Sequence, residues 1–219
     1  VNASLQPVHD FSGALTFAAP PGDNLAGLTV YAVDEIDLAA LTLVANGDAL
    51  PGNLSLQSGT VTQSGAWVVP GTTTISSSGS DVTLSNTSND FGGAVGVTGV
   101  DVTLVDANAI DLGASTVTGI YAVTATAGGG ITDSGVLNIT GTSTFTAAGG
   151  QSILLDESST FRSAVTFASG GTLANVTIND STDFDLAASA SLTLTGNLVV
   201  ASGGSISQSG NLTIGGTSS

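Results

Sequence analysis

The sequence predicts an all-β protein, a right-handed parallel β-helix (β-solenoid) of about nine coils. Three observations predict this fold. The sequence repeats itself three times, its composition suits strands rather than helices, and short runs of alternating apolar and polar residues recur every roughly 10 to 13 residues.

The repeat is marked first by an apolar residue followed by Asp and Leu. The three aspartates are Asp37, Asp111 and Asp185, and they are evenly spaced, which gives a period of about 74 residues. In a solenoid, equivalent positions stack above one another, so the apolar residues before the aspartates are expected to point inward at equivalent sites. Those residues are Ile36, Ile110 and Phe184.

Two further landmarks keep the same order. A segment ending in Ser-Gly occupies residues 61–65, 131–135 and 206–210, at nearly the same interval. A phenylalanine recurs at a similar interval, as Phe11, Phe91 and Phe161. We expect these rings to point inward and to fill one corner of the coil in register, each contributing about 1.5 to 3 kcal/mol on burial.

Composition favours strands. Charged residues make up 8% of the chain, against about 25% in ordinary globular proteins. Helices normally expose Glu, Lys, Arg and Gln, which are scarce here, whereas Val, Ile, Leu and Thr are abundant. Enough apolar residues are present to bury a core, so the composition also argues against disorder.

The strands are expected to be short and to alternate with a period of two, as in Leu41-Thr42-Leu43 and Val102-Thr103-Leu104. A hairpin sandwich shares this spacing, but it does not require a 74-residue period, whereas a solenoid does. We therefore predict a single solenoid over residues 1–219, with three coils of about 25 residues per repeat. The repeats are placed at roughly 9–88, 89–159 and 160–219.

The repeat motifs resemble a known family. Residues 89–95, 102–106, 109–113 and 130–135 resemble repeat modules of filamentous-haemagglutinin-like exoproteins, the bacterial two-partner-secretion adhesins that include biofilm-matrix adhesins. The resemblance covers the chain from Phe11 onward. It implies a stalk of stacked coils rather than a binding tip, and the family's secretion domain has no match here.

Charge limits the partners. The formal net charge is −16, and Arg162 is the one Lys or Arg residue. Nucleic acids and anionic lipids require cations to neutralise their phosphates, so neither is expected to bind. No run of 18 apolar residues is present, so no membrane insertion of this segment is predicted.

The acidic residues raise the question of a calcium site. The three recurring aspartates would be about 14 Å apart, too far to share one ion, and the Gly-Gly-x-Gly-x-Asp nonapeptide is absent. We predict no metal and no other cofactor. The acidic clusters that remain as weaker Ca²⁺ candidates are Asp34, Glu35 and Asp37, and Asp180, Asp183 and Asp185.

Catalysis is not expected, and no catalytic residue is assigned. A lyase would need a base such as Lys or Arg, and Arg162 occupies a repeat position held by Gly92 in the preceding copy. The aspartates recur with the repeat, which indicates a turn device bonding nearby backbone N–H groups. His9 is the one histidine, and Trp67 lies in an apolar run that indicates core rather than sugar stacking.

These observations predict a structural rod, a stalk segment of a secreted or surface-anchored bacterial adhesin that mediates cell-cell, surface or biofilm-matrix attachment. The alternatives are a glycan-binding module and a carbohydrate-active enzyme on a parallel β-helix. Extracellular polysaccharide or host glycans, further repeats of the chain, and end-to-end copies are the expected partners. The chain has no Met, no signal peptide and no Cys, and we expect a piece of a longer extracellular or cell-surface protein.

Overall fold

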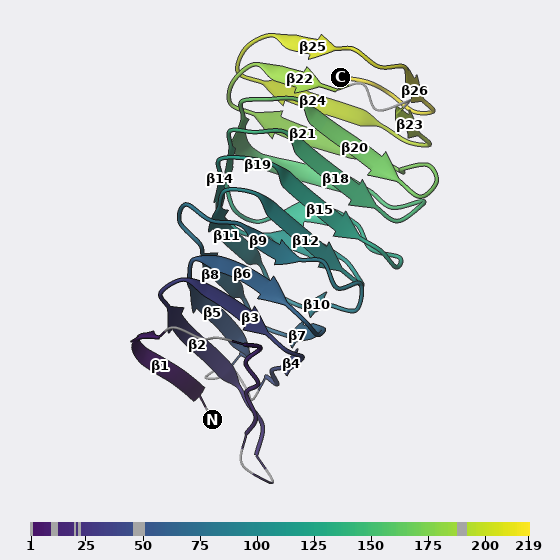
Figure 1. Cartoon of the computed structure of the whole chain (residues 1–219). Coiled ribbons are helices and arrows are strands. Elements are labelled where there is room, and N and C mark those ends of the chain that lie inside the picture. The colour runs from purple at the N-terminus through teal and green to yellow at the C-terminus, as the bar shows by residue number, and fades with distance from the viewer. Residues whose placement is uncertain (1, 10–12, 20, 22, 46–50, 188–191) are drawn as a thin grey trace.

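A computed structural model shows parallel strands stacked as a solenoid of about eight turns, which climbs from the N-terminus to the C-terminus (Figure 1). The structure describes residues 2–9, 13–19, 21, 23–45, 51–187 and 192–219, and the side chains of all of these except 2–9. All the secondary structure in these residues is β-strand. The predicted all-β solenoid is confirmed.

The largest sheet has twelve strands, and we call it sheet A. Its strands are β1 (Asn2–His9), β2 (Gly27–Ala32), β5 (Asn53–Gln57), β8 (Thr73–Ser76), β11 (Val95–Gly99), β13 (Ile110–Leu112), β14 (Ser115–Val117), β16 (Ile131–Asp133), β17 (Leu137–Ile139), β19 (Ile153–Phe161), β21 (Val176–Asp180) and β24 (Leu198–Ser202).

A nine-stranded sheet, sheet B, forms the adjoining side. Its strands are β3 (Glu35–Leu38), β6 (Thr60–Gln63), β9 (Val82–Leu84), β12 (Val102–Asp106), β15 (Tyr121–Ala125), β18 (Ser143–Ala147), β20 (Val165–Ser169), β22 (Phe184–Leu186) and β25 (Ile206–Gln208). Nine strands separated by eight steps agree with about eight turns. Two smaller sheets contain β4 (Leu41–Thr42), β7 (Trp67–Val69) and β10 (Asp90–Phe91), and β23 (Leu192–Leu194) and β26 (Leu212–Ile214).

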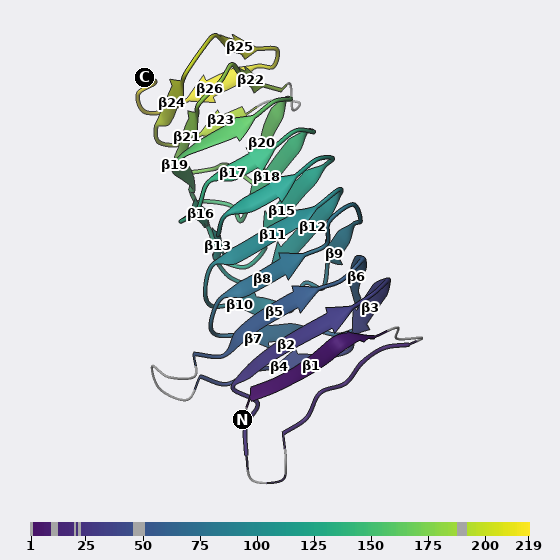
Figure 2. The same cartoon turned by 90° about the vertical axis from the view of Figure 1, so that its left-hand side faces the viewer.

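The strands within each sheet are parallel and come from successive turns. In sheet A, Ile110 pairs with Ile131, Ile131 with Ile153, Ile153 with Val176, and Val176 with Leu198. The chain runs along sheet A, turns into sheet B and returns one level higher, which is a right-handed winding (Figures 1 and 2). The predicted handedness is therefore confirmed.

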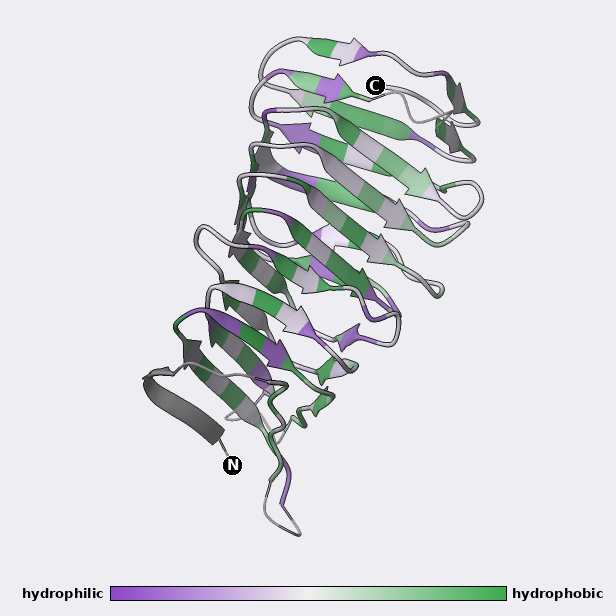
Figure 3. Cartoon of the chain, in the orientation of Figure 1, coloured by the Kyte–Doolittle hydropathy of each residue, from purple (hydrophilic) through white to green (hydrophobic). Residues whose placement is uncertain are grey.

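The interior is built by alternation along each strand. Figure 3 shows apolar and polar residues alternating along the strands of both large sheets. In β12 and β15 the first, third and fifth residues are buried, and the residues between them are half-buried. The inward rows join into one apolar core that extends from Leu25 to Leu198. Each fully buried Leu or Ile in it stabilises the fold by about 1.5 to 3 kcal/mol.

The aromatic residues pack inside this core. Tyr121 and Phe161 each meet the ring of Phe145 edge to face, at centroid distances of 5.9 and 6.1 Å, and Phe167 stacks on it at 6.1 Å. Such pairs add about 0.5 to 1.5 kcal/mol to their burial. Phe91 is also buried. Phe11 lies outside the described residues.

The predicted alignment of the landmarks is wrong in one respect. Ile36, Ile110 and Phe184 are all buried, as expected, but Ile36 and Phe184 belong to sheet B, whereas Ile110 belongs to sheet A. Likewise, Phe91 lies on β10 and Phe161 ends β19 of sheet A, so they do not share one corner.

The register of sheet B explains this difference. Seven successive pairings lead from β3 to β22, which carry the first and third copies of the Asp-Leu motif. They pass by way of Ile36, Val61, Val82, Val102, Tyr121, Ser143, Val165 and Leu186. Each repeat therefore spans about three and a half turns rather than three. The turn from Ile36 to Val61 has the expected length, but the turn from Val102 to Tyr121 is distinctly shorter.

The recurring Ser-Gly segment has a steric cause. A Cβ atom on Gly65 would lie 2.4 Å from the backbone nitrogen of Ala40, and one on Gly135 would lie 2.1 Å from that of Ala114. Both distances are far below van der Waals contact. Only glycine fits where this turn crosses the turn beneath it.

Candidate functional site

Many acidic and amide side chains form hydrogen bonds between turns. Asp101 Oδ1 accepts a hydrogen bond from the Ile120 amide at 2.7 Å, and Asp183 Oδ1 accepts one from the Ser205 amide at 2.7 Å. Asn53 Oδ1 accepts from Thr72 at 2.8 Å in the same way. These side chains occupy the corners of the solenoid, where the backbone leaves the sheets, and they supply acceptors that the sheets cannot.

Two of the three recurring aspartates, Asp111 and Asp185, also bond upward, but to side chains, whereas Asp37 Oδ1 is buried without a hydrogen-bond partner. Asp111 Oδ2 accepts from the Ser134 hydroxyl at 2.7 Å, and Asp185 Oδ1 accepts from the Ser207 hydroxyl at 2.9 Å. The prediction that these residues are structural turn devices agrees with this geometry. The predicted partner was a backbone N–H group, whereas the partner here is a hydroxyl from the next turn.

The candidate calcium ligands are not gathered into a site. Asp180 points into the core, where its Oδ1 accepts from the Thr182 amide and hydroxyl, both at 2.9 Å. Asp183 and Asp185 are exposed and engage different residues of the next turn. In the described residues, no group of three His, Cys, Asp or Glu side chains is arranged to hold a metal ion.

A second acidic group lines a shallow groove. Asp34 and Glu35 lie at its edge beside Ser58, Thr60 and Ser80, and its volume is about 510 Å³. Asp37 lies on the next outward position of β3 but does not line the groove. The lining has hydroxyl and carboxylate groups but no cation.

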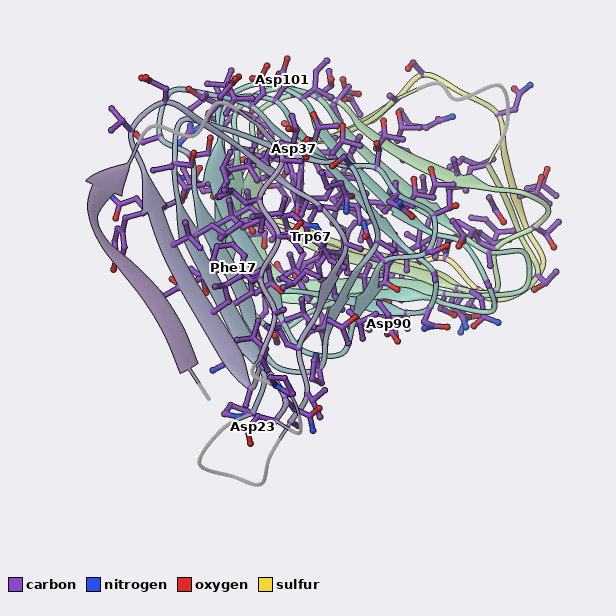
Figure 4. The ribbon with its side chains drawn as sticks, turned by 60° about the horizontal axis from the view of Figure 1, so that its bottom comes forward. Phe17, Asp23, Asp37, Trp67, Asp90 and Asp101 are labelled. Carbon is purple, nitrogen blue, oxygen red and sulfur yellow. The ribbon has the colours of Figure 1, made fainter. Side chains whose placement is uncertain are left out.

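The isolated polar and aromatic candidates are placed as follows. Arg162 is exposed next to Thr182 and Asp183. Trp67 is fully buried, with its Nε1 donating to the Leu38 carbonyl at 3.4 Å, and so it is core, as predicted. Seen from the N-terminal end, it lies inside the ring of strands, while Asp90 and Asp101 lie at the rim (Figure 4). His9 ends β1, among residues whose side chains are not described.

A set of repeating buried polar residues was not predicted from the sequence. Each accepts a hydrogen bond from the backbone amide of a bulky residue in the turn below. Asn89 bonds to Trp67 at 2.9 Å, Asp106 to Phe91 at 2.9 Å, Ser159 to Leu137 at 2.9 Å and Asp180 to Phe161 at 3.4 Å.

This arrangement could have been found in the sequence. Leu137 and Ser159 stand in the second repeat where Trp67 and Asn89 stand in the first, so the pair recurs as a unit. Asn89 also exchanges two hydrogen bonds with the side-chain amide of Gln63, at 2.8 Å each. A buried amide left without a partner costs about 1 to 3 kcal/mol, which explains why a polar residue is retained inside the core.

Two interior carboxyl groups have altered acidity. Burial raises the pKa of the Asp106 carboxyl, although N–H groups of Asn108 and Phe91 act in the opposite direction. Burial likewise raises the pKa of Asp133 to about 6. Hydrogen bonds from the backbone N–H groups of Glu157 and Asp156 lower this pKa, whereas the negative charges of the Asp156 and Glu157 side chains raise it further. Burial also raises the pKa of the Tyr121 hydroxyl.

The outward face of sheet B carries a column of threonines. Thr83 pairs with Thr103, Thr103 with Ala122, Ala122 with Thr144, and Thr144 with Thr166. Among the described residues, these four threonine hydroxyls have no hydrogen-bond partner. Because β-branched side chains are stiff, the column presents hydroxyl and methyl groups in a row with steps of about 4.8 Å, interrupted only at Ala122.

Comparison with known proteins gives one family. Repeats of unknown function (DUF5649) match residues 29–98, 99–168 and 173–219, three successive copies that cover most of the chain. No curated protein and no solved structure matches the chain. The described residues contain no helix long and apolar enough to cross a membrane.

Proposed function

The chain belongs to the family described as repeats of unknown function (DUF5649), and on that premise we propose that it is a structural rod. In this proposal it forms a stalk segment of a secreted or surface-anchored bacterial adhesin and acts in cell-cell, surface or biofilm-matrix attachment. Its role is mechanical rather than catalytic, and its location is extracellular.

The observation that carries the proposal is the use of polar residues between turns. Asp101, Asp111, Asp183 and Asp185 bond to the turn above, and the interior Asp106 bonds to the turn below. Together with the parallel main-chain pairing, these bonds connect successive levels of the stack. Carboxylates that form hydrogen bonds between successive turns of the same chain suit a mechanical spacer.

Self-association through the last turn is part of the same proposal. Ile206 on β25 is 58% exposed and Leu212 on β26 is 37% exposed. The sequence after Asp185 contains no charged residue. An uncharged sheet edge with exposed apolar side chains suits pairing with a second copy of the chain.

A replacement experiment tests the spacer role. In a cell that displays the full adhesin, these repeats would be exchanged for an unrelated solenoid of equal length, and attachment to a surface would be counted. Attachment should be retained with the exchange and reduced when the repeats are simply deleted. Loss of attachment with the equal-length exchange would contradict a purely mechanical role.

The threonine column of sheet B favours glycan binding as the second candidate. Hydroxyl and methyl groups in a flat, uncharged row suit the hydroxyl edges and C–H faces of a neutral polysaccharide. A soluble form of the chain should then sediment with insoluble cellulose, and Thr103→Glu or Thr144→Glu should abolish this. Thr116→Glu, on the outward face of sheet A, is the matched control.

A further inference from the structure

The strand β16 carries a carboxyl group in an unusual setting. Asp133 is 8% exposed and is the last residue of the strand, just before the Ser134-Gly135 corner. Its Oδ1 accepts hydrogen bonds from the amides of Asp156 at 2.9 Å and Glu157 at 3.4 Å, both on β19. Asp133 therefore connects two successive turns through one oxygen atom.

The second carboxylate oxygen of Asp133, Oδ2, lacks such donors. Asp133 Oδ2 is buried and has no hydrogen-bond partner. A buried, ionised carboxylate needs a counter-charge or several donors to offset the loss of water. In this position two N–H groups donate to Oδ1, and none donates to Oδ2.

The surroundings add negative charge rather than positive charge. The titratable groups on the strands packed against β16 are Asp111 on β13, Tyr121 on β15, and Asp156 and Glu157 on β19. The adjacent strands β17 and β18 have no titratable side chain. No cation is present on any of these strands, and Arg162, the one Lys or Arg of the chain, is exposed beside Asp183.

We propose that Asp133 makes the joint between β16 and β19 a pH-sensitive element, in which uptake of a proton holds the two turns together more tightly. Protonation removes the stranded negative charge and its repulsion by Asp156 and Glu157. It also leaves Oδ1 free to keep accepting from the two amides. The proposal concerns regulation of the rod's cohesion and does not depend on what the rod attaches to.

The direction of the effect follows from the acidity of the group. Burial places the pKa of folded Asp133 at about 6, above its ordinary value of 3.8 in an unfolded chain. The folded state therefore binds the proton more readily. The resulting stabilisation is fully present below about pH 4 and is lost as the pH rises through about 6.

Thermal melts between pH 7.5 and pH 5 test the proposal in the whole chain. The melting temperature of the unmodified protein should rise by about 2 to 6 °C over this interval. Asp133→Asn keeps an acceptor oxygen but cannot titrate, so the rise should be clearly smaller in this variant, and the buried Asp106 carboxyl, whose pKa burial also raises, accounts for the part that remains. Asp101→Asn is the matched control, because Asp101 also bonds to an amide of the next turn through Oδ1 but is exposed, and it should retain the rise.

Hydrogen exchange gives a local readout that does not depend on a variant. The amides of Asp156 and Glu157 should gain about tenfold in protection factor at pH 5 relative to pH 7.5, and amides near Asp101 should change less. An equal rise in melting temperature in the unmodified protein and Asp133→Asn would overturn the proposal. Unchanged protection at Asp156 and Glu157 would overturn it as well.

Discussion

The first and second repeats place the same motif on different sheets. Residues 61–65 begin on β6 of sheet B, whereas the equivalent residues 131–135 begin on β16 of sheet A. Each copy still forms a strand, a Ser-Gly corner and an inward apolar row. Local sequence therefore determines the strands and corners, and the accumulated length of the turns determines which sheet a copy joins.

If this is correct, equivalent core positions should respond alike although they lie on different sheets. Leu38 on β3 and Leu112 on β13 are both fully buried. Leu38→Asp and Leu112→Asp should each lower the free energy of unfolding by at least about 4 kcal/mol, because each leaves a charge in the core. Denaturant titrations measure both, and an unaffected Leu112→Asp variant would show that this position is not core.

Packing differences between the repeats should produce the next largest losses in the free energy of unfolding. Phe145 in the second repeat takes the place of Ile75 in the first, and it packs against Tyr121, Phe161 and Phe167. Phe145→Ala should cost about 3 to 5 kcal/mol and Ile75→Ala about 2 to 4 kcal/mol. Melting curves on the two variants test this order, and a larger loss for Ile75→Ala would contradict the importance of the aromatic cluster.

The buried turn-to-turn hydrogen bonds provide a smaller test. Asn89→Ala removes the partner of the Trp67 amide and also the two bonds to Gln63, whereas Ser159→Ala removes one bond to Leu137. We expect losses of about 2 to 3 kcal/mol and about 1 kcal/mol, respectively. Ser163→Ala, an exposed hydroxyl bonded to the Thr140 carbonyl, is the control and should change little. Equal losses at Asn89 and Ser163 would show that burial does not matter.

The smallest effect is expected at Arg162. Replacing this exposed side chain with alanine should change the free energy of unfolding by no more than about 0.5 kcal/mol. The equivalent Gly92 should behave differently, because a Cβ atom there would lie 2.9 Å from the Pro70 carbonyl oxygen. Gly92→Ala should lower the free energy of unfolding by about 1 to 2 kcal/mol. Urea titrations of the two variants measure both changes. If both substitutions prove neutral, the corners of the two repeats are equally open.

Much of the fold could be predicted from the sequence. Alternation identified the inward residues correctly, and Trp67, Ile36, Ile110 and Phe184 are all buried as expected. The period indicated stacked turns. The number of turns per repeat could not be predicted, because the turns differ in length. The turn from Gly27 to Asn53 is long and the turn from Val102 to Tyr121 is short, and such differences accumulate to half a turn per repeat.

The structural use of the polar residues was predicted only in part. The recurrence of Asp37, Asp111 and Asp185 pointed to a structural role, but the hydroxyl partners of Asp111 and Asp185 depend on the register between turns. Asn89 and Asp133 stand in runs that otherwise indicate ordinary surface or turn positions. Their burial follows from how the next turn crosses. For Asn89, the sequence offered one signal, the recurrence of the Trp67 and Asn89 pair as Leu137 and Ser159 one repeat later.

The half turn in each repeat affects what a second molecule meets along the rod. A surface residue that recurs once per repeat is displayed on one side in the first copy and on another side in the second, as are Asp37 on sheet B and Asp111 on sheet A. A rigid antibody or receptor approaching from a single direction therefore meets every second copy. Two such binding sites on one side would be separated by seven turns, about 33 Å at about 4.7 to 4.8 Å per turn.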